Sequence, residues 1–271
     1  SWPKLQEALN WADRVYHLAA VIGQHLVIKE PIKTLTDNIY GCQLLLEKLC
    51  KTSKKAPILI ASSSGVYGHN HKKSIDFLKE DELLEVESGK YIQTNYYLSK
   101  IVNENTALSF SDKKGIKCDI ARIFNTVGIN QTSRYGMVIP TFVKQALRNE
   151  PITVFGDGTQ TRSFCNVKDT IKAFDLLFNN PKSFGEIINV GHNEETSINE
   201  LAYLVKKLTK SDSEITFVDY KTAYGIDFLE TYGRKPYLEK LKNLTDFYPQ
   251  TTLEESINEI IDFEKNKSKQ T

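Results

Sequence analysis

A tyrosine and a lysine four residues apart, Tyr96 and Lys100, have the side-chain types and the spacing for acid–base chemistry. On a helix, this spacing puts both side chains on one face. A phenol has a pKa of about 10 and is a poor base at neutral pH, but a nearby ammonium group favours the phenolate. Tyr96 can then take a proton from an alcohol while hydride leaves the same carbon.

The spacing is weak evidence by itself, because exposed Tyr–Lys pairs on helices are common. Its context is a run of three serines, Ser62, Ser63 and Ser64, which follows an apolar segment typical of a buried strand at residues 57–61. Open α/β folds bind ligands at the carboxyl ends of their strands. A serine there can donate a hydrogen bond to the reacting oxygen while Tyr96 takes the proton, although serines at strand ends often only form turns.

The elements that position these residues alternate between strand and helix patterns. Strands are predicted at 15–19, 57–61 and 117–123, and helices at 34–50 and 91–110. The strands lack the apolar–polar alternation of a half-exposed sheet. The pattern therefore favours a parallel sheet that is covered by helices on both faces.

After Gly128 the pattern becomes more mixed. Helices are predicted at 138–149, 169–178, 197–208, 235–241 and 253–263, strands at 151–155, 164–167, 187–190 and 215–218, and a frayed polar tail at 264–271. Ser197 and Glu200 have the spacing of a capping box at the start of one of these helices. We expect a sheet domain at 1–128 and, at 129–271, mainly a smaller lobe, with some elements returning to the sheet and a cleft between the two.

Composition excludes several classes of protein. The 271 residues carry 35 basic and 34 acidic side chains, a net charge of +1, so no overall field attracts nucleic acid or an anionic membrane. No apolar run is long enough for a transmembrane helix, and no signal-peptide pattern opens the chain. The four cysteines and five histidines lack the spacing of metal ligands. We expect reduced thiols, no metal and a cytoplasmic protein.

Several motifs resemble, in order, those of the extended short-chain dehydrogenases, the NAD-dependent epimerase/dehydratase family. They are DRVYHLAA at 13–20, ASSSGVYG at 61–68, YYLSK at 96–100, RIFNTVG at 122–128, VFGDGTQTR at 154–162 and, with both glycines and the tryptophan changed, LTDFYPQTTLEESI at 244–257. The resemblance implies a Rossmann-like, doubly wound parallel sheet with a smaller mixed α/β lobe that binds substrate. It also implies NAD or NADP as cofactor, a nucleotide-diphosphate sugar as substrate, and a homodimer built on the helices at 34–50 and 91–110.

The same resemblance assigns roles to single residues. Tyr96 would be the catalytic base, Lys100 its electrostatic partner and Ser63 the hydroxyl donor. Cofactor contacts fall on Ala19, Ala20, Asn38, Ser62, Tyr96, Lys100 and Phe124. Substrate contacts fall on Ser64, Asn125, Arg162 and Arg234, and the two arginines suit the geometry of a diphosphate. His17 is expected to pack within its strand, and Arg134 is at least as readily an exposed loop residue as a substrate contact.

One part of the family's pattern has no counterpart in these residues. The family begins with a Gly-x-x-Gly-x-x-Gly turn that holds the dinucleotide pyrophosphate at a helix N-terminus, and the 271 residues contain no such motif. The missing part corresponds to two βα units, about 60 residues. We expect little or no NAD binding by the chain as it stands. Either an N-terminal part is omitted or the cofactor site is damaged, and the intact catalytic motifs favour the first explanation.

The residues that follow the strand at 57–61 narrow the reaction. By resemblance, sugar 4,6-dehydratases carry an Asp-Glu pair where this chain has Ser64 and Gly65, and nucleotide-sugar decarboxylases carry a Glu in place of Gly65. Neither acid is present, so the sequence favours a nucleotide-sugar epimerase that acts through a transient 4-keto sugar. A nucleotide-4-ketosugar reductase, and a cofactor-free domain that binds a nucleotide sugar or a partner protein, stay open as alternatives. The sugar, the nucleotide base and the choice between NAD and NADP also stay open.

Overall fold

The centre of the molecule is a parallel sheet of four strands. The computed structural model describes residues 4–68, 77–87, 91–133, 136–225 and 229–268. The strand order is β1 (Val15–His17), β2 (Ile58–Ser63), β3 (Cys118–Ile123) and β8 (Ile187–Val190). The first five residues of β2 and of β3 are all buried, because helices cover both faces of the sheet. The predicted doubly wound parallel sheet is confirmed.

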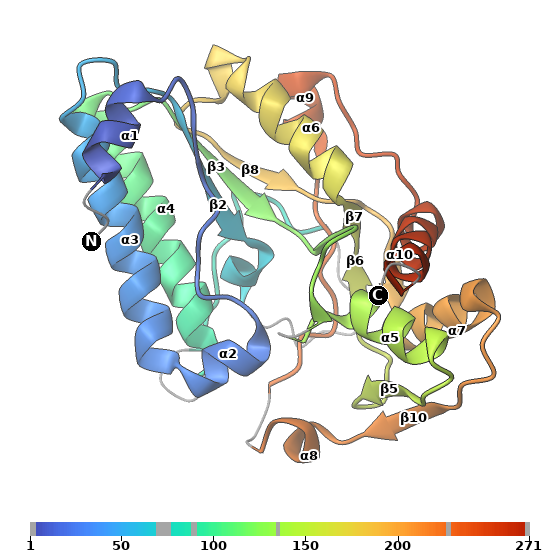
Figure 1. The fold of residues 1–271 in the computed structure, drawn as a ribbon. Coiled ribbons are helices and arrows are strands. Elements are labelled where there is room, and N and C mark those ends of the chain that lie inside the picture. Colours follow the sequence, from blue (N-terminus) through green and yellow to red (C-terminus); the bar gives the residue numbers. More distant parts are fainter. Residues whose placement is uncertain (1–3, 69–76, 88–90, 134–135, 226–228, 269–271) are drawn as a thin grey trace.

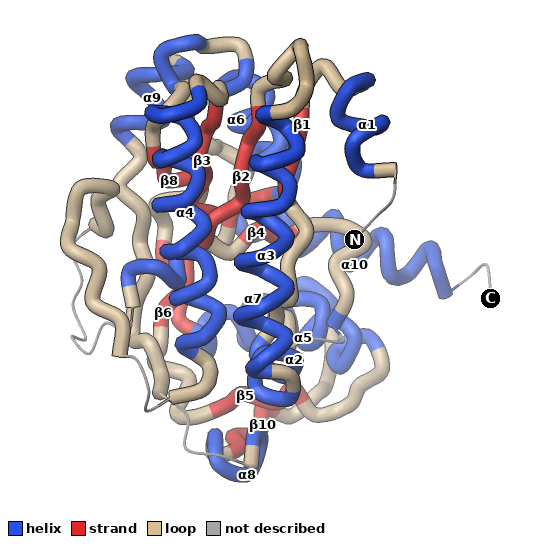
Figure 2. Tube along the Cα trace, turned by 90° about the vertical axis from the view of Figure 1, so that its left-hand side faces the viewer, coloured by secondary structure: helices blue, strands red, loops and turns tan. Residues whose placement is uncertain are grey.

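Two long helices cover one face of this sheet. α3 (Pro31–Cys50) and α4 (Thr94–Lys114) lie side by side over the strands, with the short α1 (Leu5–Trp11) against α3 (Figure 2). Proline suits the first turn of α3, where its missing N–H would have no partner in the helix. α4 ends at Gly115, whose left-handed backbone (φ +66°) is a common helix stop. The buried contact is made by Leu45, Leu46, Leu49, Ile58, Ile60, Ala107 and Ile120.

The opposite face is covered by α6 (Val167–Phe178) and α9 (Glu239–Thr245). Both helices come from the second half of the chain, as does strand β8. Their core contains Leu59, Ala121, Phe174, Leu177, Ile188 and Leu241. The second half therefore completes the sheet.

A second hydrophobic core lies beyond the carboxyl ends of the strands (Figure 1). It is formed by α5 (Val138–Leu147), α7 (Ile198–Thr209), α10 (Leu253–Ser268) and the parallel pair β5 (Ile152–Phe155) and β10 (Ile215–Val218). Two small ladders join it to the main sheet: β4 (Thr126–Val127) with β7 (Cys165–Asn166), and β6 (Thr161–Ser163) with β9 (Glu195–Ser197). Short helices complete the fold: η1 (Ser64–Tyr67), η3 (Pro181–Ser183), α2 (Gln24–Lys29) and α8 (Tyr220–Tyr224).

Differences from the predicted elements follow from local contacts. The capping box at Ser197 and Glu200 is confirmed at the start of α7. The helix predicted at 235–241 is wrong in its first half, because Pro236 forms a β-bridge with Leu78 and the helix begins only at Glu239. The tail predicted to fray continues α10 to Ser268. The short strands β4, β6 and β9 have too few residues to show a pattern of their own.

Neither a helix fit to span a membrane nor a group of metal-binding side chains occurs among the described residues. Within the described ranges, no helix combines the length and apolar character needed to cross a bilayer. Among the same residues, histidine, cysteine and acidic side chains form no group of three that could hold a metal ion. The four cysteines are free thiols.

Candidate active site

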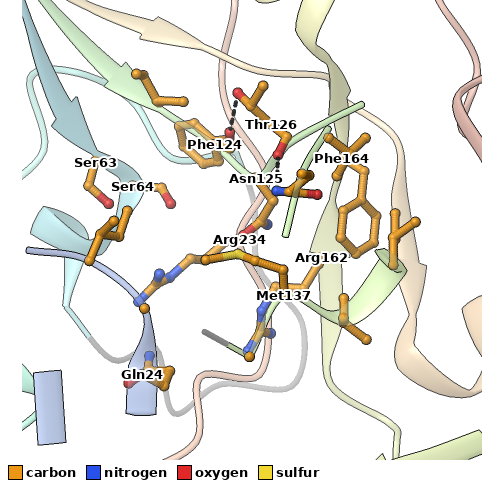
Figure 3. A pocket seen from close by; sticks show the side chains of 18 of the residues that line it. Gln24, Ser63, Ser64, Phe124, Asn125, Thr126, Met137, Arg162, Phe164 and Arg234 are labelled. Atoms are coloured by element: carbon orange, nitrogen blue, oxygen red, sulfur yellow. Dashed lines mark hydrogen bonds between the residues drawn. The ribbon is translucent and has the colours of Figure 1, made fainter. Parts of the chain in front are cut away.

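A pocket of about 1120 Å³ lies where the carboxyl ends of β2 and β3 face the second core. Most residues predicted for the site line it: Ala20, Ser62, Ser63, Ser64, Tyr96, Lys100, Phe124, Asn125, Arg162 and Arg234. Figure 3 shows Ser63 and Ser64 on one side of the pocket, Asn125 across from them, and Arg234 and Arg162 below. The pocket thus brings together segments that span more than half of the sequence.

Tyr96 and Lys100 lie on the face of α4 that packs against β2. Their exposed fractions are 9% and 2%. The ammonium group of Lys100 donates a hydrogen bond to the carbonyl oxygen of Ala61 at 2.7 Å. It also lies 5.7 Å from the centre of the Tyr96 ring. The predicted pair is therefore assembled, with the lysine anchored to the strand that carries the serines.

Burial dominates the electrostatics of this pair. It raises the pKa of Tyr96 to about 12, while the Ser63 hydroxyl and the charge of Arg234 act in the opposite direction. Burial also lowers the pKa of Lys100 to about 8, which Cys42 and Glu104 partly offset. Burial thus outweighs any effect of the Lys100 ammonium group on the pKa of this phenol. Positive charge brought close to Tyr96 would favour the phenolate that a base requires.

Ser62 and Ser63, at the end of β2, have different partners. Ser62 donates its proton to the carboxylate of Glu104, with 2.5 Å between the oxygens. The hydroxyl oxygen of Ser63 accepts from the backbone N–H of Gly65 at 3.1 Å and so caps η1. Its own proton can therefore be donated into the pocket, as a hydrogen bond to a substrate oxygen requires.

Two predicted cofactor contacts do not line the pocket. Ala19 is exposed and lies outside the lining residues. Asn38 is buried, and its amide exchanges hydrogen bonds with the backbone of Val21 at 2.7 and 3.2 Å and donates to Ser99 at 3.2 Å. Asn38 thus fixes the segment after β1 against α3 and α4, so that the neighbouring Ala20 reaches the pocket.

Arg162 enters the pocket from β6 and is held by acceptors of the chain itself. It donates to the carbonyl oxygens of Thr161 and Thr231 at 2.8 and 2.7 Å. It also donates to the carboxylate of Glu230 at 2.6 Å. The hydroxyl of Tyr220 donates to the second oxygen of the same carboxylate. Arg162 therefore already holds an anionic group in the place where a phosphate is expected.

Arg234 enters from the segment before α9. Its guanidinium lies over the ring of Tyr97, 5.1 Å from the ring centre, and donates to the Tyr97 hydroxyl at 3.1 Å. Its Nε is buried and has no hydrogen-bond partner among the described residues. Asn125, after β3, donates from its side chain to the carbonyl oxygen of Ser163 at 3.1 Å. Two guanidinium groups in one pocket favour an anionic ligand.

Three further lining residues carry no signal in the sequence: His25, Tyr97 and Glu230. The ring of His25 lies 5.0 Å from that of Tyr224, which closes the pocket between α2 and α8. Tyr97 covers Gly65 so closely that a Cβ there would lie 2.2 Å from the ring. Arg134, for which the sequence left a loop position and a substrate contact open, lies outside the described residues.

The wall formed by β2, α4 and β3 fits the nicotinamide–ribose half of a dinucleotide. An ammonium group has three N–H donors, and that of Lys100 makes one hydrogen bond within the described part of the chain, so donors remain for ribose hydroxyls. Ser62 offers acceptor lone pairs, and the fully buried Phe124 packs in the core behind this wall. The residues present do not include the glycine-rich turn that would hold the pyrophosphate.

The fold and the pocket define a nucleotide-binding α/β protein of the Rossmann type, with a Tyr–Lys pair at the carboxyl edge of its sheet. The model of the NAD dependent epimerase/dehydratase family matches residues 2–191. The chain belongs to that family, whose members are enzymes that use NAD and modify nucleotide sugars.

Two similar curated proteins are decarboxylases of UDP-linked uronic acids. The chain is 34% identical to UDP-N-acetyl-alpha-D-glucosaminuronate decarboxylase of Bacillus cytotoxicus, over 95% of this chain and 78% of the relative. It is 31% identical to UDP-glucuronic acid decarboxylase 1 of Danio rerio, over 93% of this chain and 57% of the relative. The chain thus spans little more than half the length of the second relative.

Solved structures with the same fold include 4-epimerases. UDP-glucuronic acid 4-epimerase from Bacillus cereus, in complex with UDP-glucuronic acid and NAD, matches with a TM-score of 0.84 and 27% identity, over 98% of this chain and 79% of that one. UDP-glucose 4-epimerase from Thermotoga maritima, with UDP-glucose, matches with a TM-score of 0.85 and 25% identity, over 97% and 82%. Similarity thus extends to enzymes of two reaction types.

Proposed function

We propose that the protein is an NAD(P)-dependent nucleotide-sugar 4-epimerase that acts through a transient 4-keto sugar. The observation that carries the proposal is the arrangement of the pocket. Tyr96 and Lys100 of α4 and Ser63 of β2 line the pocket, and Arg162 and Arg234 enter it from β6 and from the segment before α9. A sugar held by its diphosphate at the arginines can place a hydroxyl-bearing carbon between the serine and the tyrosine.

The reacting groups would work as follows. Bound NAD supplies the acceptor for hydride from C4 and the donor for its return. Tyr96 takes the proton of the 4-hydroxyl as the C4–H bond breaks, and gives it back to the oxygen when hydride returns to the other face. Ser63 donates a hydrogen bond to the same oxygen. The ammonium group of Lys100 would favour the phenolate of Tyr96 that accepts this proton and that forms again when the proton is returned.

The diphosphate end of the substrate would be held by Arg162, Arg234 and Asn125. A bidentate guanidinium–phosphate contact is stronger than a neutral hydrogen bond. A bidentate contact that uses the Nη2 donor of Arg162 now bound to Glu230 would have to replace that carboxylate. The Nε of Arg234, buried and without a partner among the described residues, is a donor available to the ligand.

Decarboxylation is the second candidate, because the named relatives in the sequence comparison are decarboxylases. The geometry around Gly65 argues against it. The resemblance places a glutamate of the decarboxylases at this position, but here even a Cβ would lie 2.2 Å from the ring of Tyr97. An acidic side chain cannot fit there while Tyr97 keeps its place. The local packing thus supports epimerisation.

The experiment that tests the proposal is turnover of UDP-glucuronic acid and UDP-glucose by the full-length protein with catalytic amounts of NAD, followed by NMR. A 4-epimer with the carboxylate retained supports the proposal. Release of CO₂ would identify a decarboxylase. Consumption of NADPH in proportion to a reduced product from a 4-keto sugar would identify a reductase. Binding of UDP without binding of NAD and without turnover would indicate a cofactor-free binding domain.

We also propose a homodimer that pairs α3 and α4 of two copies, and a division of the chain at residue 128 into a cofactor part and a mainly substrate-binding part. Large apolar side chains are exposed on these helices: Ile32 at 77%, Tyr40 at 61% and Val102 at 40%. A shallow groove between the helices is lined by residues of both, including Gln43 and Phe110. A second pair of helices would cover this surface.

A further inference from the structure

A buried ion pair lies directly behind the catalytic wall. Arg122 of β3 donates from Nε and from Nη2 to the two carboxylate oxygens of Glu104 on α4, at 3.0 and 2.9 Å. Both side chains are 3% exposed. The hydroxyl of Ser62, at the end of β2, donates to the same carboxylate at 2.5 Å. Three elements of the wall therefore meet at one carboxylate.

The presence of this buried ion pair is not explained by a gain in the folding stability of the protein. Removing two charges from water costs as much free energy as the pair regains unless every polar atom is satisfied, and apolar replacements are often equally stable. Here Arg122 also donates from Nη1 to the carbonyl oxygen of Glu80 at 3.2 Å, and its guanidinium lies 4.8 Å from the ring centre of Tyr67. Contacts from several elements thus hold the pair in place, which suits a positioning role.

Glu104 also faces the catalytic lysine. It lies one helical turn beyond Lys100 on the same face of α4, and it acts to raise the pKa of that ammonium group against the larger effect of burial. The other titratable groups near Lys100 are Cys42 of α3, His17 of β1 and Tyr96 of α4. Burial raises the pKa of Cys42 to about 11 and that of Tyr96 to about 12, and lowers that of His17 to about 4. All three are neutral at pH 7, so Glu104 supplies the negative charge in this group, and Arg122 of β3, which is paired with Glu104, supplies a positive charge that partly offsets it.

The contact with Ser62 has a separate consequence. Because its proton goes to Glu104, Ser62 presents only lone pairs to the pocket. The contact also fixes the strand end just before Ser63, whose hydroxyl acts on Tyr96. Orientation of this kind matters, since a misplacement of about 1 Å can reduce a rate by about 100-fold.

We propose that Glu104 is a positioning residue of the active site, which holds the end of β2 through Ser62 and keeps Lys100 in its ammonium form. The effect of Glu104 on turnover rests on the proposed function. The effects of Glu104 on Lys100 and on the end of β2 do not rest on it, because they are properties of the chain without substrate.

The test compares Glu104→Gln, which keeps the shape and removes the charge, with Glu104→Asp, which keeps the charge. Glu47→Gln, at an exposed position of α3, is the matched control. We expect kcat of Glu104→Gln to fall about tenfold to 100-fold at neutral pH, with little change in KM for the nucleotide sugar. The alkaline limb of its pH profile should move to lower pH, because Lys100 loses its proton earlier. Glu104→Asp should restore the pH profile.

A second readout needs no turnover. In ¹⁵N NMR of lysine-labelled protein, Lys100 should titrate at lower pH in Glu104→Gln than in the wild type or Glu47→Gln. An unchanged titration of Lys100 would overturn the electrostatic half of the proposal, even if the wild-type protein proved not to be an epimerase. Conversely, if the wild type shows no epimerase activity but Lys100 titrates at lower pH in Glu104→Gln, only the proposed function is contradicted.

Glu104→Gln leaves Arg122 without its counter-charge and can therefore fail to fold. Ser62→Ala and Glu104→Asp test the proposal in that event. Ser62→Ala keeps the ion pair and should lower kcat without moving the titration of Lys100. The kcat of the double variant Ser62→Ala/Glu104→Gln should be little lower than that of the slower single variant, since both changes affect the same contact between Ser62 and Glu104. Wild-type kcat in Ser62→Ala, or fully additive losses, would overturn the positioning half of the proposal.

Discussion

The carboxylate of Glu230 lies 2.6 Å from the guanidinium of Arg162, inside the pocket that a nucleotide sugar would occupy. The two residues are about 15% and 20% exposed, so the pair is only partly screened by water. A ligand diphosphate and Glu230 therefore compete for the same donors. The affinity of the pocket for its ligand depends on how readily Glu230 leaves.

Glu230→Gln should therefore strengthen binding of UDP. The neutral amide holds Arg162 less firmly, so the diphosphate replaces it at a lower cost, and we expect about a fivefold to tenfold lower Kd. Calorimetry with UDP measures the effect, with Glu254→Gln on the exposed face of α10 as the control. Equal or weaker binding in Glu230→Gln would show that Glu230 supports the arginine instead of competing with the ligand.

Tyr96→Phe should abolish turnover and leave UDP-sugar affinity nearly intact. The phenylalanine ring keeps the packing of the buried tyrosine, while the group that exchanges the proton is lost. General acid–base groups contribute about 10² to 10⁴ in rate, which sets the expected fall in kcat. Tyr203→Phe, on the exposed side of α7, is the control. Retained activity in Tyr96→Phe would refute its assignment as the base.

Gly65→Ala should destabilise the protein, because its Cβ would lie 2.2 Å from the Tyr97 ring. Overpacking of this kind costs about 1–3 kcal/mol in the free energy of unfolding. Gly41→Ala on α3 is the matched control, since nothing lies within 4 Å of its added Cβ and alanine favours a helix. Urea unfolding compares the two. Gly65→Ala should cost less in a Tyr97→Ala background than in the wild type, because that background lacks the clashing ring, and an equal cost would contradict the packing argument.

Stability should fall as pH rises from about 4 to about 6 through Asp119. Burial raises the pKa of this fully buried carboxyl to about 6, and Ser183 offsets only part of the shift. The single proton of the Ser183 hydroxyl is directed to the carbonyl oxygens of Leu177 and Asn180, and neither carboxyl oxygen of Asp119 has a hydrogen-bond partner among the described residues. The unfolded chain loses its proton near pH 4 while the folded chain keeps it, so the unfolded state gains in this window.

Asp119→Asn should remove this dependence. The penalty in the wild type is fully present above pH 6 and amounts to about 2–3 kcal/mol. Urea unfolding from pH 4 to 7 measures it, with Asp112→Asn at an exposed position of α4 as the control. An equal pH slope for wild type and Asp119→Asn would contradict the assignment.

Tyr40→Glu on α3 should convert the proposed dimer to a monomer. A charge in the centre of an apolar helix interface is desolvated without a partner. Analytical ultracentrifugation measures the state, and Tyr203→Glu, equally exposed but on α7, is expected to leave it unchanged. A wild-type monomer, or a dimer that survives Tyr40→Glu, would exclude this interface.

The sequence by itself determined the class of fold and the main residues of the pocket. Strand-type apolar runs and helical periodicity are local, so the βαβ alternation could be predicted without knowledge of the packing. Tyr96 and Lys100 share a helix face, and the serines end a strand, for reasons of spacing that need no tertiary contact. Short strands such as β6 and β9 were missed, because each is defined by its partner and not by its own three residues.

Only the tertiary structure decided how these residues are held and charged. Glu230 and Arg162 are 68 positions apart, and no sequence pattern links them. Tyr97 next to Gly65, and Glu104 between Ser62 and Arg122, are equally contacts between different elements. The pKa of Tyr96 follows the same rule, because burial sets it and burial is a property of the packed chain. Spacing places a side chain on a face, but the desolvation and charge that give it chemistry come from what the fold packs against it.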